Sequence, residues 1–295
     1  MEIFLTGGTG FVGREILAHL LSAGHRVRAL VRREQALQNR ERVETVVGDT
    51  TEASSLSGLL CGCDAVIHLV GIIREKRKNG ITFERLHVES TYNVAMAAKN
   101  QGVSRFLQMS ANGSRAEAVT AYHQTKWAAE ELLRQSQLDW TIFRPSLIFG
   151  PNDQFVNMLA GLIRTLPVVP VPGDGKYRLQ PVSVTNVAEG FVRALAVTDS
   201  IGQTYHCAGP RTYSYNEILD MIGAALGRNR VYKLHQPLVL MKPLVALLQS
   251  LAAFPLTSDQ LQMLLEGNCC DPTHWRESLN LKLIDFNHGI AGYLR

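Results

Sequence analysis

A tyrosine and a lysine stand four positions apart in the stretch Tyr122-His-Gln-Thr-Lys126. On a helix such residues share one face, where an ammonium lowers the pKa of a nearby phenol. The pair can then transfer a proton, and the lysine can bind a ribose hydroxyl. The spacing alone is common by chance, but here it follows an apolar run that ends in the hydroxyl of Ser110. We therefore predict Tyr122, Lys126 and Ser110 as the catalytic residues.

A glycine-rich turn lies near the N-terminus, in Thr6-Gly-Gly-Thr-Gly-Phe-Val-Gly13. An apolar run precedes it and apolar residues at helical spacing follow it, so the turn joins a strand to a helix. There Gly7 permits a tight turn, Gly10 lets the backbone approach a phosphate, and Gly13 lets the helix pack on the strand. The helix N-terminus would offer N–H groups to a dinucleotide pyrophosphate; an ordinary turn is the alternative. The residues predicted to bind the cofactor here are Gly7, Thr9, Gly10, Phe11, Val12 and Gly13.

The end of the second predicted strand bears on which dinucleotide binds. An Asp or Glu there would hydrogen-bond the adenine ribose, but this sequence has Val31 followed by Arg32 and Arg33. Two guanidiniums would bind a 2′-phosphate, so we predict NADP(H) in preference to NAD(H). The alternative is that both arginines are ordinary surface residues. Asp49, after the third strand, can accept a hydrogen bond from the adenine amino group or simply form a turn.

Strands and helices alternate along the chain, which predicts an α/β fold with a Rossmann-type, doubly wound parallel sheet. The predicted strands cover residues 3–5, 26–31, 43–47, 65–70, 105–110, 140–143 and 179–184. The predicted helices cover 83–100, 122–135, 152–166 and 186–195, the last N-capped by Thr185, and 167–175 is a predicted loop.

Two domains are expected. Residues 1–152 and about 179–202 would form the NADP(H)-binding domain, and 153–178 with 203–295 a smaller, mostly helical substrate domain. Since ligands bind at the carboxyl ends of parallel strands, the cleft between the domains is the expected active site.

The composition is that of a globular protein. Of the 295 residues, 46% are hydrophobic and 19% charged, and the net charge is only +4. The one basic cluster, at 74–78, lacks interleaved aromatic residues, so we expect no nucleic-acid partner. The five cysteines lack the spacing of a zinc site, so we expect no metal and free thiols in a reducing cytoplasm. The chain begins directly in a predicted core strand, which we interpret as leaving no room for a signal peptide.

The chain resembles the extended short-chain dehydrogenase/reductase superfamily over nearly its whole length. The matching segments are Thr6-Gly-Gly-Thr-Gly-Phe-Val-Gly13, Gly48-Asp49, Asp64-Ala-Val-Ile-His-Leu-Val-Gly71, Tyr122 with Lys126, and Arg144-Pro-Ser-Leu-Ile-Phe-Gly-Pro151. Residues 166–173 and 179–188 are similar to the atypical branch that contains the NADPH-binding accessory subunit of respiratory complex I and its bacterial relatives. The resemblance implies that Val70, Gly71 and Pro145 also contact the cofactor, together with Ser110, Tyr122 and Lys126.

The chain departs from the catalytic pattern of that superfamily at three positions. Ala111 stands where a catalytic Ser or Thr is usual, so Ser110, Asn112 or Ser114 would have to polarise a substrate oxygen. His87 replaces an Asn used in proton relay, and Leu147 replaces an Asn common in nucleotide-sugar enzymes. Two functions remain open. One is an NADPH-dependent oxidoreductase or epimerase-like enzyme on a small or lipid-like carbonyl; the other is a non-catalytic NADPH-binding accessory or assembly protein of a respiratory or quinone-related complex.

The most apolar stretch covers residues 237–254 and is interrupted by Lys242 and Pro243. The run after them is shorter than the roughly 20 apolar residues that span a bilayer. It can be a helix in the core of the second domain, a wall of a pocket for an apolar substrate, or a surface that docks on a membrane or membrane-bound partner. The protein would accordingly be cytoplasmic or peripheral to a membrane.

Overall fold

A computed structural model describes residues 1–33, 42–249 and 256–294. The chain divides into two compact units, each built from three segments. The first unit contains Met1–Pro145, Thr185–Cys207 and Thr273–Leu281, and the second contains Ser146–Val184, Ala208–Pro272 and Lys282–Arg295.

The first unit is built on a seven-stranded sheet in which every neighbouring pair is parallel. In spatial order its strands are β11 (Gln203–Cys207), β6 (Asp139–Pro145), β5 (Arg105–Met109), β4 (Ala65–His68), β1 (Glu2–Thr6), β2 (Arg26–Val31) and β3 (Val43–Val47). β1 and β4 are almost wholly buried, as expected of strands covered on both faces. The predicted doubly wound α/β fold is confirmed.

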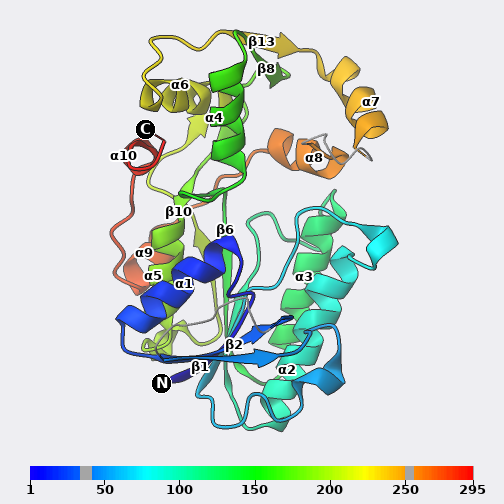
Figure 1. Cartoon of the computed structure of the whole chain (residues 1–295), viewed down its shortest axis with the longest axis vertical. Coiled ribbons are helices and arrows are strands. Elements are labelled where there is room, and N and C mark those ends of the chain that lie inside the picture. Colours follow the sequence, from blue (N-terminus) through cyan, green and yellow to red (C-terminus); the bar gives the residue numbers. More distant parts are fainter. Residues whose placement is uncertain (34–41, 250–255, 295) are drawn as a thin grey trace. The chain divides into compact units, whose positions relative to one another are not determined.

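Helices cover both faces of this sheet (Figure 1). They are α1 (Phe11–Ser22), α2 (Ser90–Asn100), α3 (Ala121–Arg134), α5 (Val184–Ala194) and α9 (Thr273–Ser278). α2 and α3 pack together on one face, where Phe4, Phe106 and Val94 belong to one buried cluster. α1 and α5 lie on the other face, joined by a hydrogen bond between Thr185 and Glu15. The helix predicted at 83–100 begins with a π-helical turn, Glu84–Glu89, before it continues as α2.

The second unit combines helices with short two-stranded pairs. Its elements are β7 (Ile148–Phe149), α4 (Phe155–Thr165), β8 (Val169–Pro172), β9 (Arg178–Leu179), β10 (Val182–Ser183), β12 (Tyr213–Ser214), α6 (Tyr215–Ala225), β13 (Lys233–Gln236), α7 (Leu238–Leu248), α8 (Ser258–Glu266) and α10 (Phe286–Ala291). The pairs are β7 with β10, β8 with β13, and β9 with β12. Its core contains the apolar faces of α4 and α6, with residues such as Leu159 and Ile222 fully buried.

Several predicted boundaries are wrong for identifiable reasons. Residues 203–207, expected in the smaller domain, form β11 at the edge of the large sheet, where Tyr205 and Cys207 are buried. The strand predicted at 179–184 is split into β9 and β10 because Pro181, between them, has no N–H to donate. The predicted loop at 167–175 contains β8, which pairs with β13. Prolines have no N–H to donate, but the N–H groups of Val169 and Gly173 at the two ends of β8 donate hydrogen bonds to the chain around β13. α5 begins at Val184, so Thr185 lies inside the helix.

Candidate cofactor and catalytic site

The site residues predicted from the sequence lie at the carboxyl-terminal edge of the large sheet. Gly7 follows β1, Val70 and Gly71 follow β4, Ser110 follows β5, and Pro145 ends β6. The strands are paired in register up to these ends, with Thr6 opposite His68 and Met109 opposite Phe143. The fold thus gathers segments that are far apart in the sequence at one edge of the sheet.

The glycine turn has a shape that only glycines allow. Gly7 has a φ of +73°, and a Cβ on Gly13 would lie 2.2 Å from the Gly7 carbonyl oxygen. Thr9 and Gly10 are exposed, Phe11 is half-buried and Val12 is buried. Gly10 is the N-cap of α1 and makes no side-chain capping bond, so α1 starts with N–H groups that lack a helical partner. This cradle fits a dinucleotide pyrophosphate.

Arg14 is a candidate that the sequence interpretation missed. Its Nε donates to the carbonyl oxygen of Thr9 at 3.0 Å, so this hydrogen bond holds an exposed cation beside the glycine turn. A positive charge beside free helix N–H groups favours a phosphate. The basic residue directly after Gly13 was the signal that could have found it.

The structure places the remaining adenosine-side candidates near the ends of β2 and β3. Arg32 and Arg33 are both exposed, directly after β2. The carboxylate oxygen Oδ1 of Asp49 accepts bonds from the backbone N–H and the hydroxyl of Thr51, each at 2.9 Å. Asp49 therefore has the turn-forming contacts that were its alternative interpretation, and it is half-buried.

Tyr122 and Lys126 lie on α3, whose first turn is capped by Thr120. Lys126 is buried, and its ammonium donates to the carbonyl oxygen of Met109 at 3.1 Å. The same Nζ would lie 2.8 Å from a Cβ on Gly71, so a glycine there makes room for the lysine. Burial lowers the pKa of Lys126 to about 8, against the opposing effect of Glu130.

The half-buried Tyr122 is a protonated phenol. Burial raises its pKa to about 12, so the lowering by Lys126 that the sequence predicted is not seen in this state. Its ring meets the rings of His87 and Phe83 edge-on, with centroids 5.4 and 5.8 Å away. A phenol held in this way can donate a proton.

His87 holds α3 against the segment after β4. Its Nδ1 lies 2.9 Å from the hydroxyl of Thr125, which itself donates to the carbonyl oxygen of Ala121. Its Nε2 lies 3.1 Å from both the N–H and the carbonyl oxygen of Ile72, so the tautomer decides which ring nitrogen donates. Burial and the nearby Lys126 lower the pKa of His87 to about 2, consistent with a neutral ring. Both ring nitrogens are engaged, so His87 positions α3 rather than relaying protons.

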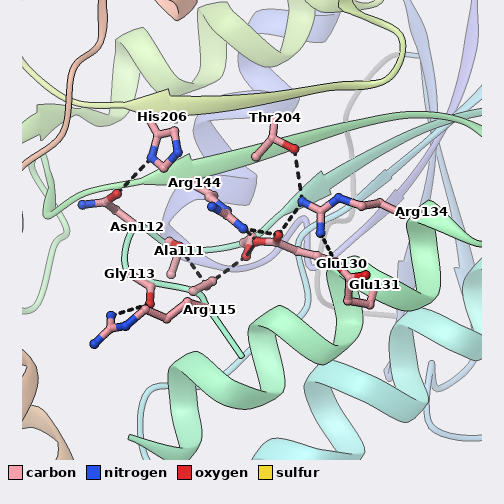
Figure 2. Close-up of polar contacts among 12 residues, drawn as sticks. Ala111, Asn112, Gly113, Arg115, Glu130, Glu131, Arg134, Arg144, Thr204 and His206 are labelled. Atoms are coloured by element: carbon pink, nitrogen blue, oxygen red, sulfur yellow. Dashed lines mark hydrogen bonds and ion pairs between the residues drawn. The ribbon is translucent and has the colours of Figure 1, made fainter. Parts of the chain in front are cut away.

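Ser110 belongs to a buried charge network around Glu130, whose contacts with Arg144 and Arg134 are drawn in Figure 2. Its hydroxyl donates to Glu130 Oε1 at 2.5 Å, and Glu130 is fully buried. Arg144 contacts both oxygens of Glu130, Nε to Oε1 at 2.9 Å and Nη2 to Oε2 at 2.6 Å. Arg134 adds a contact to Oε2 at 2.8 Å, and the Trp127 ring lies under both guanidiniums. The carboxylate is thus compensated by two cations and one hydroxyl.

The loop after Ser110 is held from several sides. The Ser114 hydroxyl, 3.2 Å from that of Ser110, donates to the carbonyl oxygen of Ala111 at 2.8 Å. Asn112 donates its N–H to Pro145 and turns its side-chain oxygen toward His206 on β11 (Figure 2). The hydroxyl protons of Ser110 and Ser114 are therefore both committed within the protein.

No helix in the described ranges 1–33, 42–249 and 256–294 is long and apolar enough to cross a membrane. Within the same ranges, no cluster of three or more His, Cys, Asp or Glu side chains could hold a metal ion.

Comparison with known proteins agrees with this geometry. A family model described as NAD(P)H-binding matches residues 7–162. The chain is 30% identical over 242 residues to the ceramide reductase of Caulobacter vibrioides, covering 81% of this chain and 75% of that one. It is 27% identical over 225 residues to the mitochondrial NADH dehydrogenase (ubiquinone) 1 alpha subcomplex subunit 9 of Arabidopsis thaliana, covering 73% of this chain. It spans only 56% of the length of that subunit.

The fold is also that of a solved dTDP-glucose 4,6-dehydratase from Streptomyces venezuelae, with a TM-score of 0.79 at 19% identity. That match covers 100% of this chain and 96% of the other. From the glycine cradle, the parallel sheet and the matched residues 7–162, we conclude that the chain belongs to the NAD(P)H-binding family, as an atypical short-chain dehydrogenase/reductase.

Proposed function

We propose that this protein is an NADPH-dependent reductase of a small or lipid-like carbonyl compound. The observation that carries the proposal is that Tyr122, a protonated phenol, and the buried ammonium of Lys126 stand four residues apart on α3. Both lie at the sheet edge that bears the glycine cradle. When bound there, the reduced nicotinamide supplies a hydride to the carbonyl carbon.

Tyr122 would supply the matching proton to the carbonyl oxygen. A phenol with a pKa near 12 is fully protonated at neutral pH, so the donor is ready before the substrate binds. As the phenol gives up its proton, the positive charge of Lys126 would stabilise the phenolate that forms. Water would then return a proton to Tyr122. Lys126 is held in place for this by Met109 and by the absence of a side chain at Gly71.

NADP(H) is the proposed form of the cofactor, with NAD(H) as the weaker alternative. Arg32 and Arg33 are exposed where a 2′-phosphate would lie, and no carboxylate stands at Val31 to repel it. Arg14, braced by Thr9, would neutralise the pyrophosphate.

The similarity to a ceramide reductase supports an apolar substrate with a reducible group. The apolar, exposed α7 supports the same view, since a protein that acts on lipids would work beside a membrane. We therefore propose that the protein works in the cytoplasm, peripheral to a membrane.

A second candidate function is a non-catalytic NADPH-binding accessory protein of a respiratory complex. It is supported by the similarity to the subunit 9 family of NADH dehydrogenase and by the loop 110–114. There, Ala111 offers only a methyl, and the hydroxyl protons of Ser110 and Ser114 are committed to Glu130 and Ala111. In this role the cofactor would stabilise the first unit and Tyr122 would only contact the ribose.

Single-turnover oxidation of bound NADPH separates the two functions. Long-chain 3-oxo lipids and short-chain ketones are offered to the NADPH-loaded protein, and loss of the nicotinamide absorbance is followed. The reductase requires oxidation of NADPH that Tyr122→Phe abolishes while NADPH binding persists. Tyr92→Phe, at an exposed position of α2, should leave the oxidation intact. NADPH that stays reduced with every substrate, and that resists dialysis, would instead establish the accessory role.

A further inference from the structure

α7 exposes an apolar face that the described residues of the second unit do not cover. Four large side chains of this helix are exposed, Val239 by 82%, Leu240 by 70%, Leu244 by 49% and Leu247 by 75%. Only Val245 of the helix is buried. A soluble surface rarely leaves such a cluster open without a partner.

These side chains form one continuous stripe. Successive helical residues are about 100° apart, so Val239, Pro243, Leu247, Leu240 and Leu244 fall within about 140° of the helix circumference. Val245 lies on the opposite side, toward α8, the helix that α7 packs against. In Figure 1, α7 stands apart from α4 and α6, the helices that form the core of the same unit. We call this stripe the α7 face.

The chain segment that contains α7 carries charge of one sign. Residues 221–258 contain no Asp or Glu but include Arg228, Arg230, Lys233 and Lys242. Lys233 is paired with Asp220 at 2.5 Å, whereas in the described part of the chain neither Arg230 nor Lys242 has an acidic partner. The Arg230 guanidinium lies 5.1 Å from the ring centre of Tyr232, which is 58% exposed. Lys242 is on α7 itself, whereas Arg230 and Tyr232 precede β13. A cation on a helix that exposes leucines is suited to the boundary between water and lipid.

We propose that the α7 face docks on the surface of an anionic lipid membrane. The leucines would enter the boundary between headgroups and acyl chains, and Lys242 would meet the lipid phosphates. A second copy of this chain fits less well, because two such faces would bring like charges together. α7 is also only about 16 Å long, so by itself it offers less than the roughly 800 Å² per partner of a stable protein interface. A bilayer needs neither an opposite face nor a matching shape.

Co-sedimentation with vesicles tests this directly, using the full chain without cofactor or substrate. The vesicles are phosphatidylcholine alone, or phosphatidylcholine with phosphatidylglycerol. We expect the protein to bind the anionic vesicles. In Leu240→Gln/Leu247→Gln, the affinity for these vesicles should fall on the order of tenfold for each leucine removed. The matched control is Tyr92→Gln/Ile201→Gln, which removes two exposed apolar side chains of the first unit. Circular dichroism and NADPH binding establish that each variant is folded.

The electrostatic part is tested by Lys242→Gln. We expect about fivefold weaker binding to the anionic vesicles and no change on phosphatidylcholine, while Lys78→Gln changes neither. Equal binding to both vesicle types would overturn the role of charge. Failure of the protein to co-sediment with the anionic vesicles would overturn the proposal. A dimer of the unaltered protein that is lost in Leu240→Gln/Leu247→Gln would also overturn it, because the α7 face would then bind a second copy of the chain. Because no reaction is followed, these outcomes are independent of whether the protein is a reductase.

Discussion

A single methyl group at Gly13 should damage both the first unit and its cofactor site. A Cβ there would lie 2.2 Å from the Gly7 carbonyl oxygen and 2.8 Å from the Gly8 Cα, both backbone atoms. Real Cβ contacts are 3.0 Å or more, so α1 and the turn must separate by about 0.8 Å. Forcing such a group into a packed site destabilises a protein by about 1–3 kcal/mol. The N–H groups of residues 11–13 move with α1, and one lost bond to a charged phosphate lowers NADPH affinity by about tenfold to a hundredfold.

Urea denaturation followed by tryptophan fluorescence measures the first effect, because Trp127, Trp140 and Trp275 all belong to the first unit. Titration with NADPH measures the second. The matched control is Gly161→Ala in α4, where an added Cβ meets nothing within 4 Å. It should leave the tryptophan transition and the NADPH affinity unchanged. If Gly13→Ala also left both unchanged, α1 would not be fixed against the glycine turn as described.

Three further predictions concern charge and protonation. Arg32→Ala should lower the affinity for NADPH about tenfold to a hundredfold and leave the affinity for NADH nearly unchanged, measured by titration with each cofactor. Equal affinities of the unaltered protein for NADPH and NADH would refute the 2′-phosphate contact. Glu130→Gln should lower the stability of the first unit by about 3–5 kcal/mol, measured from the urea midpoint, because Arg144 and Arg134 lose their buried partner. The control is Glu131→Gln, which removes the charge of a half-buried partner of Arg134 on the same helix. Burial lowers the pKa of His68 to about 3 and that of His87 to about 2, so below pH 6.5 only the unfolded chain takes up these two protons. Stability should then fall with falling pH, by up to about 2.7 kcal/mol per pH unit, and His87→Asn should halve that slope; an unchanged slope would contradict the assignment.

The local patterns of this sequence predicted the fold well because each reports a local backbone requirement. The tight turn expected at Gly7 and the close approach expected at Gly13 are both seen in the structure, as a positive φ and as a 2.2 Å distance from an added Cβ to the Gly7 oxygen. β11 was assigned to the wrong domain because a five-residue strand carries no information about which sheet it joins. Its pairing with β6 depends on how the chain between Pro145 and Gln203 folds before it returns to the sheet.

The buried network at Glu130 shows what the sequence could not reveal. With Arg134 four residues later on the same helix, Glu130 looks like half of an exposed surface pair. Of its other partners, Ser110 follows β5 and Arg144 lies in β6, and both approach Glu130 only once the sheet has formed. The commitment of the Ser110 proton, which bears directly on catalysis, therefore could not be inferred from spacing.

The strand order has a consequence for how the chain is made. β6 lies next to the edge of the sheet, and its outer partner β11 comes 57 residues after Pro145. At a synthesis rate of about 5–20 residues per second, the outer backbone of β6 waits about 3–12 s for that partner. During this time the N–H and C=O groups of β6 form an open edge that another nascent chain can pair with. The ribosome-bound protein should therefore be most prone to misassociation, and most dependent on a chaperone, between the emergence of β6 and that of β11.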